Sequence, residues 1–198
     1  MSFTAPEPVD RWRTVDLVVA AVIAVAFGAL FQAWNGVWAL TEPLFRFFWP
    51  AQALMYGVWL LPGVLAALVV RRRGAAFFGG FVAAAVSLLL GSPYGLDSLL
   101  SGAVQGAGAE LVFAFALYRS WGLSAALLAG AASGIGAWLH DVPIYYPKVD
   151  IGLQLAYGAF ILLSGAIVAG AGAWILTRAL AETGVLAPFA SGRQQRQV

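Results

Sequence analysis

The sequence predicts an all-α integral membrane protein, and three observations support this class. Hydrophobic residues make up 62% of the 198 residues, and charged residues make up only 10%. The mean hydropathy of +0.85 is far above that of a soluble globular domain. The charges are also spaced so that long apolar segments lie between them, and each segment can be assigned to one helix.

The charged residues separate six segments that contain no charge except Glu110. The segments are 17–41, 47–70, 74–96, 98–118, 120–140 and 151–177. Each reaches the roughly 20 residues that an α-helix needs to cross a bilayer. We therefore expect one domain of six transmembrane helices over residues 11–181, between a flexible N-terminal tail at 1–10 and a cytoplasmic C-terminal tail at 182–198.

The basic residues predict the orientation of these helices. If six spans alternate in direction, nine basic residues lie on one side of the membrane, and only Arg46 and Lys148 lie on the other. The nine are Arg11, Arg13, Arg71, Arg72, Arg73, Arg119, Arg178, Arg193 and Arg196. Because the side richer in lysine and arginine is normally cytoplasmic, we expect both termini in the cytoplasm.

Several function classes are disfavoured by composition. The chain has no cysteine and one histidine, His140, so we expect no disulfide, no metal site and no cofactor. The basic residues are scattered at segment ends, and a nucleic-acid partner is therefore not expected. An intramembrane hydrolase is disfavoured because Ser133 and Ser164 lack the preceding glycine of a nucleophile motif. We predict that the protein is not an enzyme.

A stripe of small residues follows the first predicted helix. Ala20, Ala24 and Gly28 recur every four residues, which places them on nearly one face. Small side chains allow a second backbone to approach closely in a membrane. The second backbone is either a helix of the same chain or a partner protein, and the pattern alone favours neither.

Glu110 is the charged residue within the predicted spans. A carboxylate at such depth is costly and usually serves a ligand, an ion or a proton. Gly102 and Gly106 precede it at steps of four residues, so all three lie on nearly one face. We interpret Glu110 as a ligand-binding residue. The structural alternative is a protonated Glu110 that bonds to a neighbouring helix.

Aromatic and amide side chains gather toward the predicted outer ends of the helices. A simple aromatic belt would mark both membrane interfaces, and amides inside a span are expected to point inward. With Glu110, the residues expected to line an outward-facing pocket are Trp34, Asn35, Gln52, Tyr56, Gln105, Trp138, His140 and Tyr157. Aromatic faces and a carboxylate suit a flat ring that carries a positive charge or an amine.

His140 and Asp141 stand just before a proline-containing loop, and they allow two interpretations. One is a simple helix end with a surface pair between Asp141 and Lys148, which would contribute little to stability. The other is a lid over the ligand, with Tyr145 and Tyr146 as its apolar contacts.

Three runs resemble a known family. They are WPAQALMYGVWLLPGVLAALVVRRRGAA at 49–76, GSPYGLDS at 91–98 and LLSGAVQGAGAELVFA at 99–114. Together they look like the YkoE family, the substrate-binding S-components of energy-coupling-factor (ECF) transporters associated with thiamine or its hydroxymethylpyrimidine precursor. The similarity spans roughly residues 11–181, and it carries over one site residue, Glu110, within the family-like QGxGAELVF run.

This resemblance implies a six-helix S-component fold in a bacterial cell membrane, with a vitamin site facing outward. It also implies a transmembrane coupling protein and two cytoplasmic ATPase subunits as partners, with the Ala20, Ala24 and Gly28 stripe docking the coupling protein. The chain itself lacks the GxxxxGK[ST] phosphate-binding motif, so ATP hydrolysis would be the partners' task.

One alternative function remains open at this point. A self-sufficient small carrier or channel subunit would use Glu110 as a proton or cation relay. The choice between intact thiamine and its pyrimidine moiety also stays open, because both share the ring that the predicted pocket would hold.

Overall fold

The computed structural model describes residues 11–195, and every regular element in that range is helical. The expected N-terminal tail at 1–10 lies outside the described residues. The elements are α1 (Thr14–Thr41), η1 (Glu42–Phe45), η2 (Trp49–Met55), α2 (Gly57–Val70), α3 (Ala75–Leu89), α4 (Asp97–Phe115), α5 (Leu123–Tyr145), α6 (Ile151–Ser164), the π-helical η3 (Gly165–Ala171), α7 (Gly172–Glu182) and α8 (Ala190–Gln195). The predicted all-α class is confirmed.

Five stretches of the described chain are long and apolar enough to cross a membrane. They are Thr14–Phe45, Trp49–Val70, Asp97–Phe115, Leu123–Tyr145 and Ile151–Glu182. The sixth expected span, 74–96, forms only the 15-residue α3, because the chain turns at Gly91 and Gly95, where φ is 90° and 58°. At about 1.5 Å per residue, α3 is about 22 Å long, which is less than the roughly 30 Å of a hydrocarbon core. Six full-length spans therefore stay a prediction.

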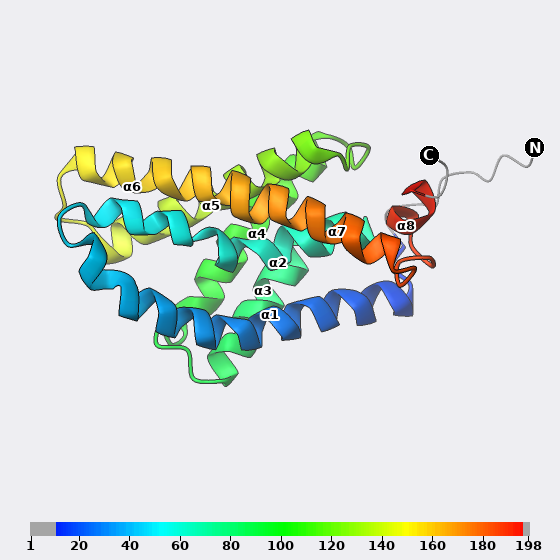
Figure 1. The fold of residues 1–198 in the computed structure, drawn as a ribbon, viewed down its shortest axis with the longest axis horizontal. Coiled ribbons are helices and arrows are strands. Elements are labelled where there is room, and N and C mark those ends of the chain that lie inside the picture. Colours follow the sequence, from blue (N-terminus) through cyan, green and yellow to red (C-terminus); the bar gives the residue numbers. More distant parts are fainter. Residues whose placement is uncertain (1–10, 196–198) are drawn as a thin grey trace, which may run out of the picture.

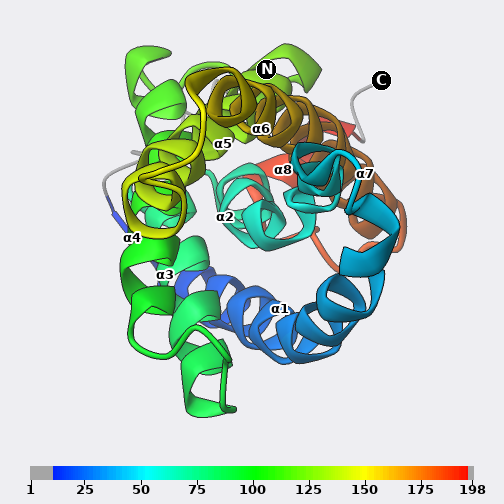
Figure 2. The same ribbon diagram turned by 90° about the vertical axis from the view of Figure 1, so that its left-hand side faces the viewer.

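Helix α2 forms the centre of the molecule, with the other long helices around it (Figure 2). All of its 14 residues are buried except Val58 and Trp59, which are half-buried. A helix that is apolar on every face must be covered by lipid chains or by other helices. For α2, the other helices of the chain provide this cover.

The small-residue stripe of α1 packs inside the chain. Ala20 and Ala24 have no exposed surface, and a Cβ atom added to Gly28 would lie 2.7 Å from the carbonyl oxygen of Ala83 on α3. The side chain of Val86 would be equally close, at 2.6 Å. The stripe therefore packs against α3 of the same chain. This packing corrects the assignment of the stripe to a partner interface and supports the intramolecular alternative.

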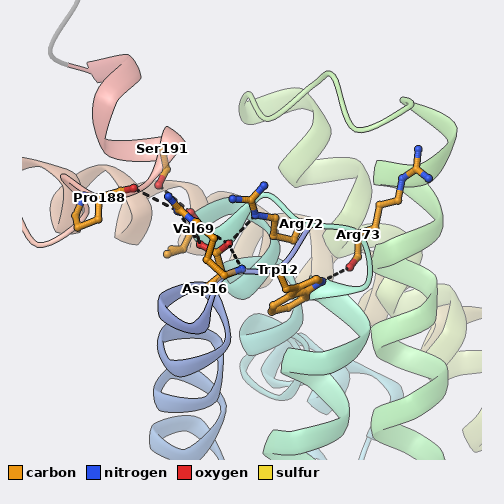
Figure 3. A network of polar contacts seen from close by, with 8 residues as sticks. Trp12, Asp16, Val69, Arg72, Arg73, Pro188 and Ser191 are labelled. Carbon is orange, nitrogen blue, oxygen red and sulfur yellow. Dashed lines mark hydrogen bonds and ion pairs between the residues drawn. The ribbon is translucent and has the colours of Figure 1, made fainter. Parts of the chain in front are cut away.

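A group of hydrogen-bonded charged residues lies at the end of the molecule that carries Arg13 and Arg72, the arginine-rich end (Figure 3). Asp16 has no exposed surface, and its carboxylate accepts a hydrogen bond from Arg72 Nε at 2.7 Å. Arg13 donates to the same carboxylate from Nη2 at 2.8 Å. Two guanidinium groups thus compensate one carboxylate, as a charge removed from water requires.

The C-terminal segment also packs against this end and is not a free tail. Leu186 and Phe189 are each only 2% exposed. Ser191 Oγ donates to the carbonyl oxygen of Val69, the last but one residue of α2, at 2.8 Å. Arg13 Nη2 donates to the carbonyl oxygen of Pro188, so the beginning and the end of the described chain meet (Figure 1).

We predict that Ala24→Trp destabilises the fold by about 1–3 kcal/mol or more, because an indole cannot enter a close-packed helix contact without moving α3. Thermal unfolding of the purified protein in detergent measures this effect. Val22→Trp is the matched control, since Val22 is 61% exposed on the same helix and its replacement should leave the melting temperature nearly unchanged. Equal melting temperatures for the two variants would contradict internal packing of the stripe.

Candidate ligand-binding site

A cavity of about 180 Å³ lies between α1, α2, α3, α4, α5 and α6, toward the end opposite the arginine-rich one. The turn between α3 and α4 and the start of the loop after α5 complete its walls. Its lining residues are Phe31, Asn35, Trp38, Tyr56, Trp59, Gly80, Ala84, Ser87, Ser92, Tyr94, Asp97, Ser98, Ser101, Gly102, Gln105, Asp141, Tyr145, Tyr146 and Tyr157. The cavity thus combines aromatic rings, hydroxyl and amide groups, and two carboxylates.

One wall of the cavity is a cluster of aromatic rings from α1 and α2. Trp38 and Trp59 have ring centroids 5.0 Å apart, and Tyr56 lies edge-on to both at 6.2 Å and 5.3 Å. Tyr94, from the turn after α3, contacts the edge of Trp59 at 6.5 Å. Such offset and edge-to-face contacts are favourable, and they hold the ring faces in fixed positions. A flat ligand would therefore meet a rigid aromatic surface.

Beside these rings, the cavity carries two carboxylates that a histidine joins. His140 Nδ1 lies 2.9 Å from Asp141 Oδ1, and His140 Nε2 lies 3.1 Å from Asp97 Oδ1. Tyr157 Oη donates to Asp141 Oδ2 at 2.7 Å, and the Tyr145 hydroxyl donates to Asp97 Oδ2. His140 and Asp141 are almost fully buried, whereas the Asp97 side chain is 26% exposed.

The protonation of His140 sets the charge of this group. A neutral imidazole has one N–H and can donate to one of the two carboxylates, whereas an imidazolium donates to both. With both carboxylates ionised, Asp97, His140 and Asp141 together carry one net negative charge when His140 is protonated and two when it is neutral. This charge stands beside the aromatic wall, in a site from which water is partly excluded.

Two amides place polar groups at the cavity. Asn35 Oδ1 accepts a hydrogen bond from Trp59 Nε1 at 3.2 Å, while Asn35 Nδ2 is the buried side-chain atom without a partner in the described part of the chain. Gln105 Nε2 donates to Ser101 Oγ at 2.6 Å. A buried N–H group without a partner is costly. Asn35 Nδ2 is therefore positioned to donate to an acceptor on a ligand.

Four of the residues predicted from the sequence line this cavity: Asn35, Tyr56, Gln105 and Tyr157. His140 stands behind the lining and holds the two carboxylates in place. Trp34, Gln52 and Trp138 do not line the cavity. Their side chains donate to main-chain carbonyl oxygens of Met55, Trp38 and Gln154 at 3.1, 2.8 and 2.8 Å, respectively.

Glu110 lies outside the cavity, at the arginine-rich end of the molecule. Its Oε1 accepts hydrogen bonds from the Gly74 N–H at 2.6 Å and from Tyr118 Oη at 2.7 Å, and its Oε2 accepts one from the Ala76 N–H at 2.9 Å. The two N–H groups are main-chain donors at the start of α3, which have no partner within that helix. The ligand-binding role predicted for Glu110 is therefore replaced by a structural one.

The glycines before Glu110 explain its position. A Cβ atom on Gly106 would lie 3.0 Å from Phe77 Cα, so this face of α4 packs against α3. Glu110 follows one turn later on the same face and reaches the first residues of α3. The stripe that aligned Glu110 with small residues in the sequence was thus a helix-packing face.

The carboxylates that do line the cavity were not among the predicted site residues. The interpretation of Asp141 as a partner of Lys148 at the surface is corrected, because Asp141 is buried against His140 and Tyr157. The sequence does contain a signal for this: Ser133, Ala137 and Asp141 recur every four residues and share one face of α5, which continues to Tyr145. Trp38, Trp59, Tyr94 and Asp97 were also missed as lining residues.

Comparison with known proteins agrees with this fold. The family model for the permease component of ABC-type cobalt transport systems matches residues 15–136. YkoE of Bacillus subtilis (strain 168), whose name associates it with HMP (hydroxymethylpyrimidine) and thiamine, is 30% identical over 187 residues, which cover 94% of this chain and 93% of YkoE. A crystal structure of an S-component of an ECF transporter matches with a TM-score of 0.89 and 30% identity, over 94% of both chains.

These matches confirm the resemblance seen in the sequence, and they agree with the predictions of a multi-pass plasma-membrane protein and of a protein that is not an enzyme. The chain belongs to this family of transport-system permease components, as a relative of YkoE with the fold of an ECF-transporter S-component.

Proposed function

We propose that the protein captures thiamine, or its hydroxymethylpyrimidine precursor, on the outer side of the membrane for ATP-driven uptake. The observation that carries this proposal is the cavity itself, which places aromatic rings beside the negatively charged group of Asp97, His140 and Asp141. The name of the relative YkoE supports the same class of substrate.

The chemistry of thiamine matches both the rings and the carboxylates. Its thiazolium ring carries a permanent positive charge, which aromatic faces attract through cation–π contacts and a carboxylate attracts directly. Its aminopyrimidine ring has nitrogen acceptors suited to Asn35 Nδ2 and an amino group suited to a carboxylate or to the Gln105 oxygen. Hydroxymethylpyrimidine lacks the thiazolium, so the charged group should favour thiamine over the precursor.

Energy for uptake would come from partner subunits. We infer a transmembrane coupling protein and two cytoplasmic ATPases, since the chain has no phosphate-binding GxxxxGK[ST] motif. Six spans and cytoplasmic termini remain part of this proposal. Their support is that Arg13, Arg72 and the C-terminal segment meet at one end of the molecule, while the cavity lies toward the other.

Titration of the purified protein with each compound tests the substrate. Trp38 and Trp59 form the cavity wall, so thiamine should quench tryptophan fluorescence in a saturable way, and hydroxymethylpyrimidine should bind more weakly. The double variant Trp38→Phe/Trp59→Phe should lose most of the signal change. Flat titrations of the unmodified protein with both compounds at micromolar concentration would refute the proposal.

We expect Asp141→Asn to weaken thiamine binding by about 1.5–3 kcal/mol, or roughly ten- to a hundredfold, because it removes a carboxylate from the cavity lining at nearly constant volume. Binding of hydroxymethylpyrimidine should fall less. Asp150→Asn is the matched control, since Asp150 is exposed at the start of α6 and asparagine can cap that helix equally well.

Asp97→Asn provides a second test, because Asp97 is more exposed than Asp141 and its replacement is less disruptive to folding. Isothermal titration gives the affinities, and melting temperatures report whether each variant is folded. Unchanged thiamine affinity in folded Asp141→Asn and Asp97→Asn proteins would exclude the carboxylate role.

Glu110→Gln should lower stability by about 1–3 kcal/mol and leave thiamine affinity unchanged. The reason is that one amide oxygen cannot accept all three hydrogen bonds from Gly74, Ala76 and Tyr118. Melting temperature and titration of this variant measure the two effects. A relay role in a self-sufficient carrier predicts the reverse, namely normal stability together with loss of ion-dependent transport by the protein alone in liposomes.

A further inference from the structure

A second cavity, of about 550 Å³, lies at the arginine-rich end and is separate from the proposed ligand site. Arginine side chains from three parts of the chain line it: Arg71 follows α2, Arg119 follows α4, and Arg178 lies on α7. Glu182 is the carboxylate residue of this lining. The lining therefore carries an excess of two positive charges, from three guanidinium groups and one carboxylate.

Tryptophan rings hold two of these guanidinium groups in place. Arg178 Cζ lies 4.7 Å from the ring centroid of Trp174, and Arg71 Cζ lies 5.9 Å from that of Trp121. Cation–π contacts of this kind restrain the direction of a guanidinium group. Arg71 Nε also donates to the carbonyl oxygen of Leu68 at 3.4 Å. Burial lowers the pKa of Arg71 to about 10, which still leaves it charged at neutral pH.

The side chains around the cavity are of the kinds found at the boundary between hydrocarbon and water. Ile175 and Leu176, which follow Trp174 on α7, are 58% and 39% exposed, and Leu123, which follows the lining residue Gly122, is 41% exposed. Exposed aliphatic side chains of a membrane protein face lipid chains, and tryptophan favours the headgroup level. In that setting the arginines would lie at the level of the lipid phosphate groups.

We propose that this cavity binds the phosphate group of an anionic membrane lipid. Arg71, Arg119 and Arg178 would donate to the phosphate oxygens, and the planar fork of each guanidinium matches a phosphate group. Basic pockets between helices at the cytoplasmic side of a membrane have the charge that such headgroups require. The acyl chains would lie along the exposed aliphatic side chains of α7.

Occupancy would have a structural consequence. Arg71, Arg119 and Arg178 belong to three separate parts of the chain, and Ser191 of the C-terminal segment also lines the cavity. A single phosphate group that contacts all three arginines would tie the ends of α2, α4 and α7 together. Anionic lipid should therefore raise the stability of the whole protein.

The test uses the full-length protein in detergent, without partner subunits, and phosphatidylglycerol as the probe. Phosphatidylglycerol should raise the melting temperature by several degrees and remain bound in native mass spectrometry, whereas phosphatidylcholine should do neither. The double variant Arg119→Gln/Arg178→Gln should bind phosphatidylglycerol at least about tenfold more weakly, given the strength of charge-assisted hydrogen bonds. Arg46→Gln, which removes an exposed arginine near the opposite end, is the matched control and should bind normally.

Three results would overturn the proposal. They are equal stabilisation by phosphatidylglycerol and phosphatidylcholine, unchanged phosphatidylglycerol binding in the double variant, and equal stabilisation by inorganic phosphate at the same concentration, which would identify a site for soluble anions. Circular dichroism checks that the double variant is folded. The single variant Arg119→Gln, at an exposed position after α4, is the fallback and should show a smaller loss in the same direction.

Discussion

The absence of water from the hydrocarbon core is the constraint on which this structure depends. Every main-chain N–H and C=O group at that depth needs a partner within the protein. Regular helices satisfy these groups along their central turns, but the 3-10 segment η2 and the first turns of α2 and α3 leave main-chain groups that side chains satisfy. Ser164 Oγ donates to the Leu54 carbonyl and accepts from the Gly57 N–H, at 2.6 Å and 2.9 Å. At the arginine-rich end, Glu110 accepts hydrogen bonds from the main-chain N–H groups at the start of α3.

The same constraint explains which site residues could be predicted from the sequence. A polar side chain within an apolar segment is expected to form hydrogen bonds inside the protein. The sequence does not show whether its partner is a ligand or the main chain of a neighbouring helix. Gln105 and Asn35 line the cavity, whereas Gln52 and Glu110 bond to main-chain groups. Asp141 was hidden for a different reason, because it stands near a predicted helix end where a charge is usually exposed.

The fold was more predictable than the site. The long apolar segments of α1, α5 and α6 with α7 follow from the spacing of charges, since each must cross the membrane as a helix. The length of α3 could not be read in this way, because the turn at Gly91 and Gly95 contains no charge to mark it. The packing of Leu186 and Phe189 could not be predicted from the sequence either, because it depends on a surface that exists only after the other helices have enclosed α2.

The short α3 links the cavity to the membrane around it. Its exposed side includes Phe77 and Phe81, whose rings stack with centroids 5.8 Å apart, and its buried side supplies Gly80, Ala84 and Ser87 to the cavity wall. In the proposed six-span arrangement, lipids beside a helix of about 22 Å would have to compress to cover it, at a cost of fractions of a kcal/mol per ångström. A thicker bilayer would then exert a larger force on this wall than a thinner one. The acyl-chain length of the host membrane would in this way affect how well the cavity is formed.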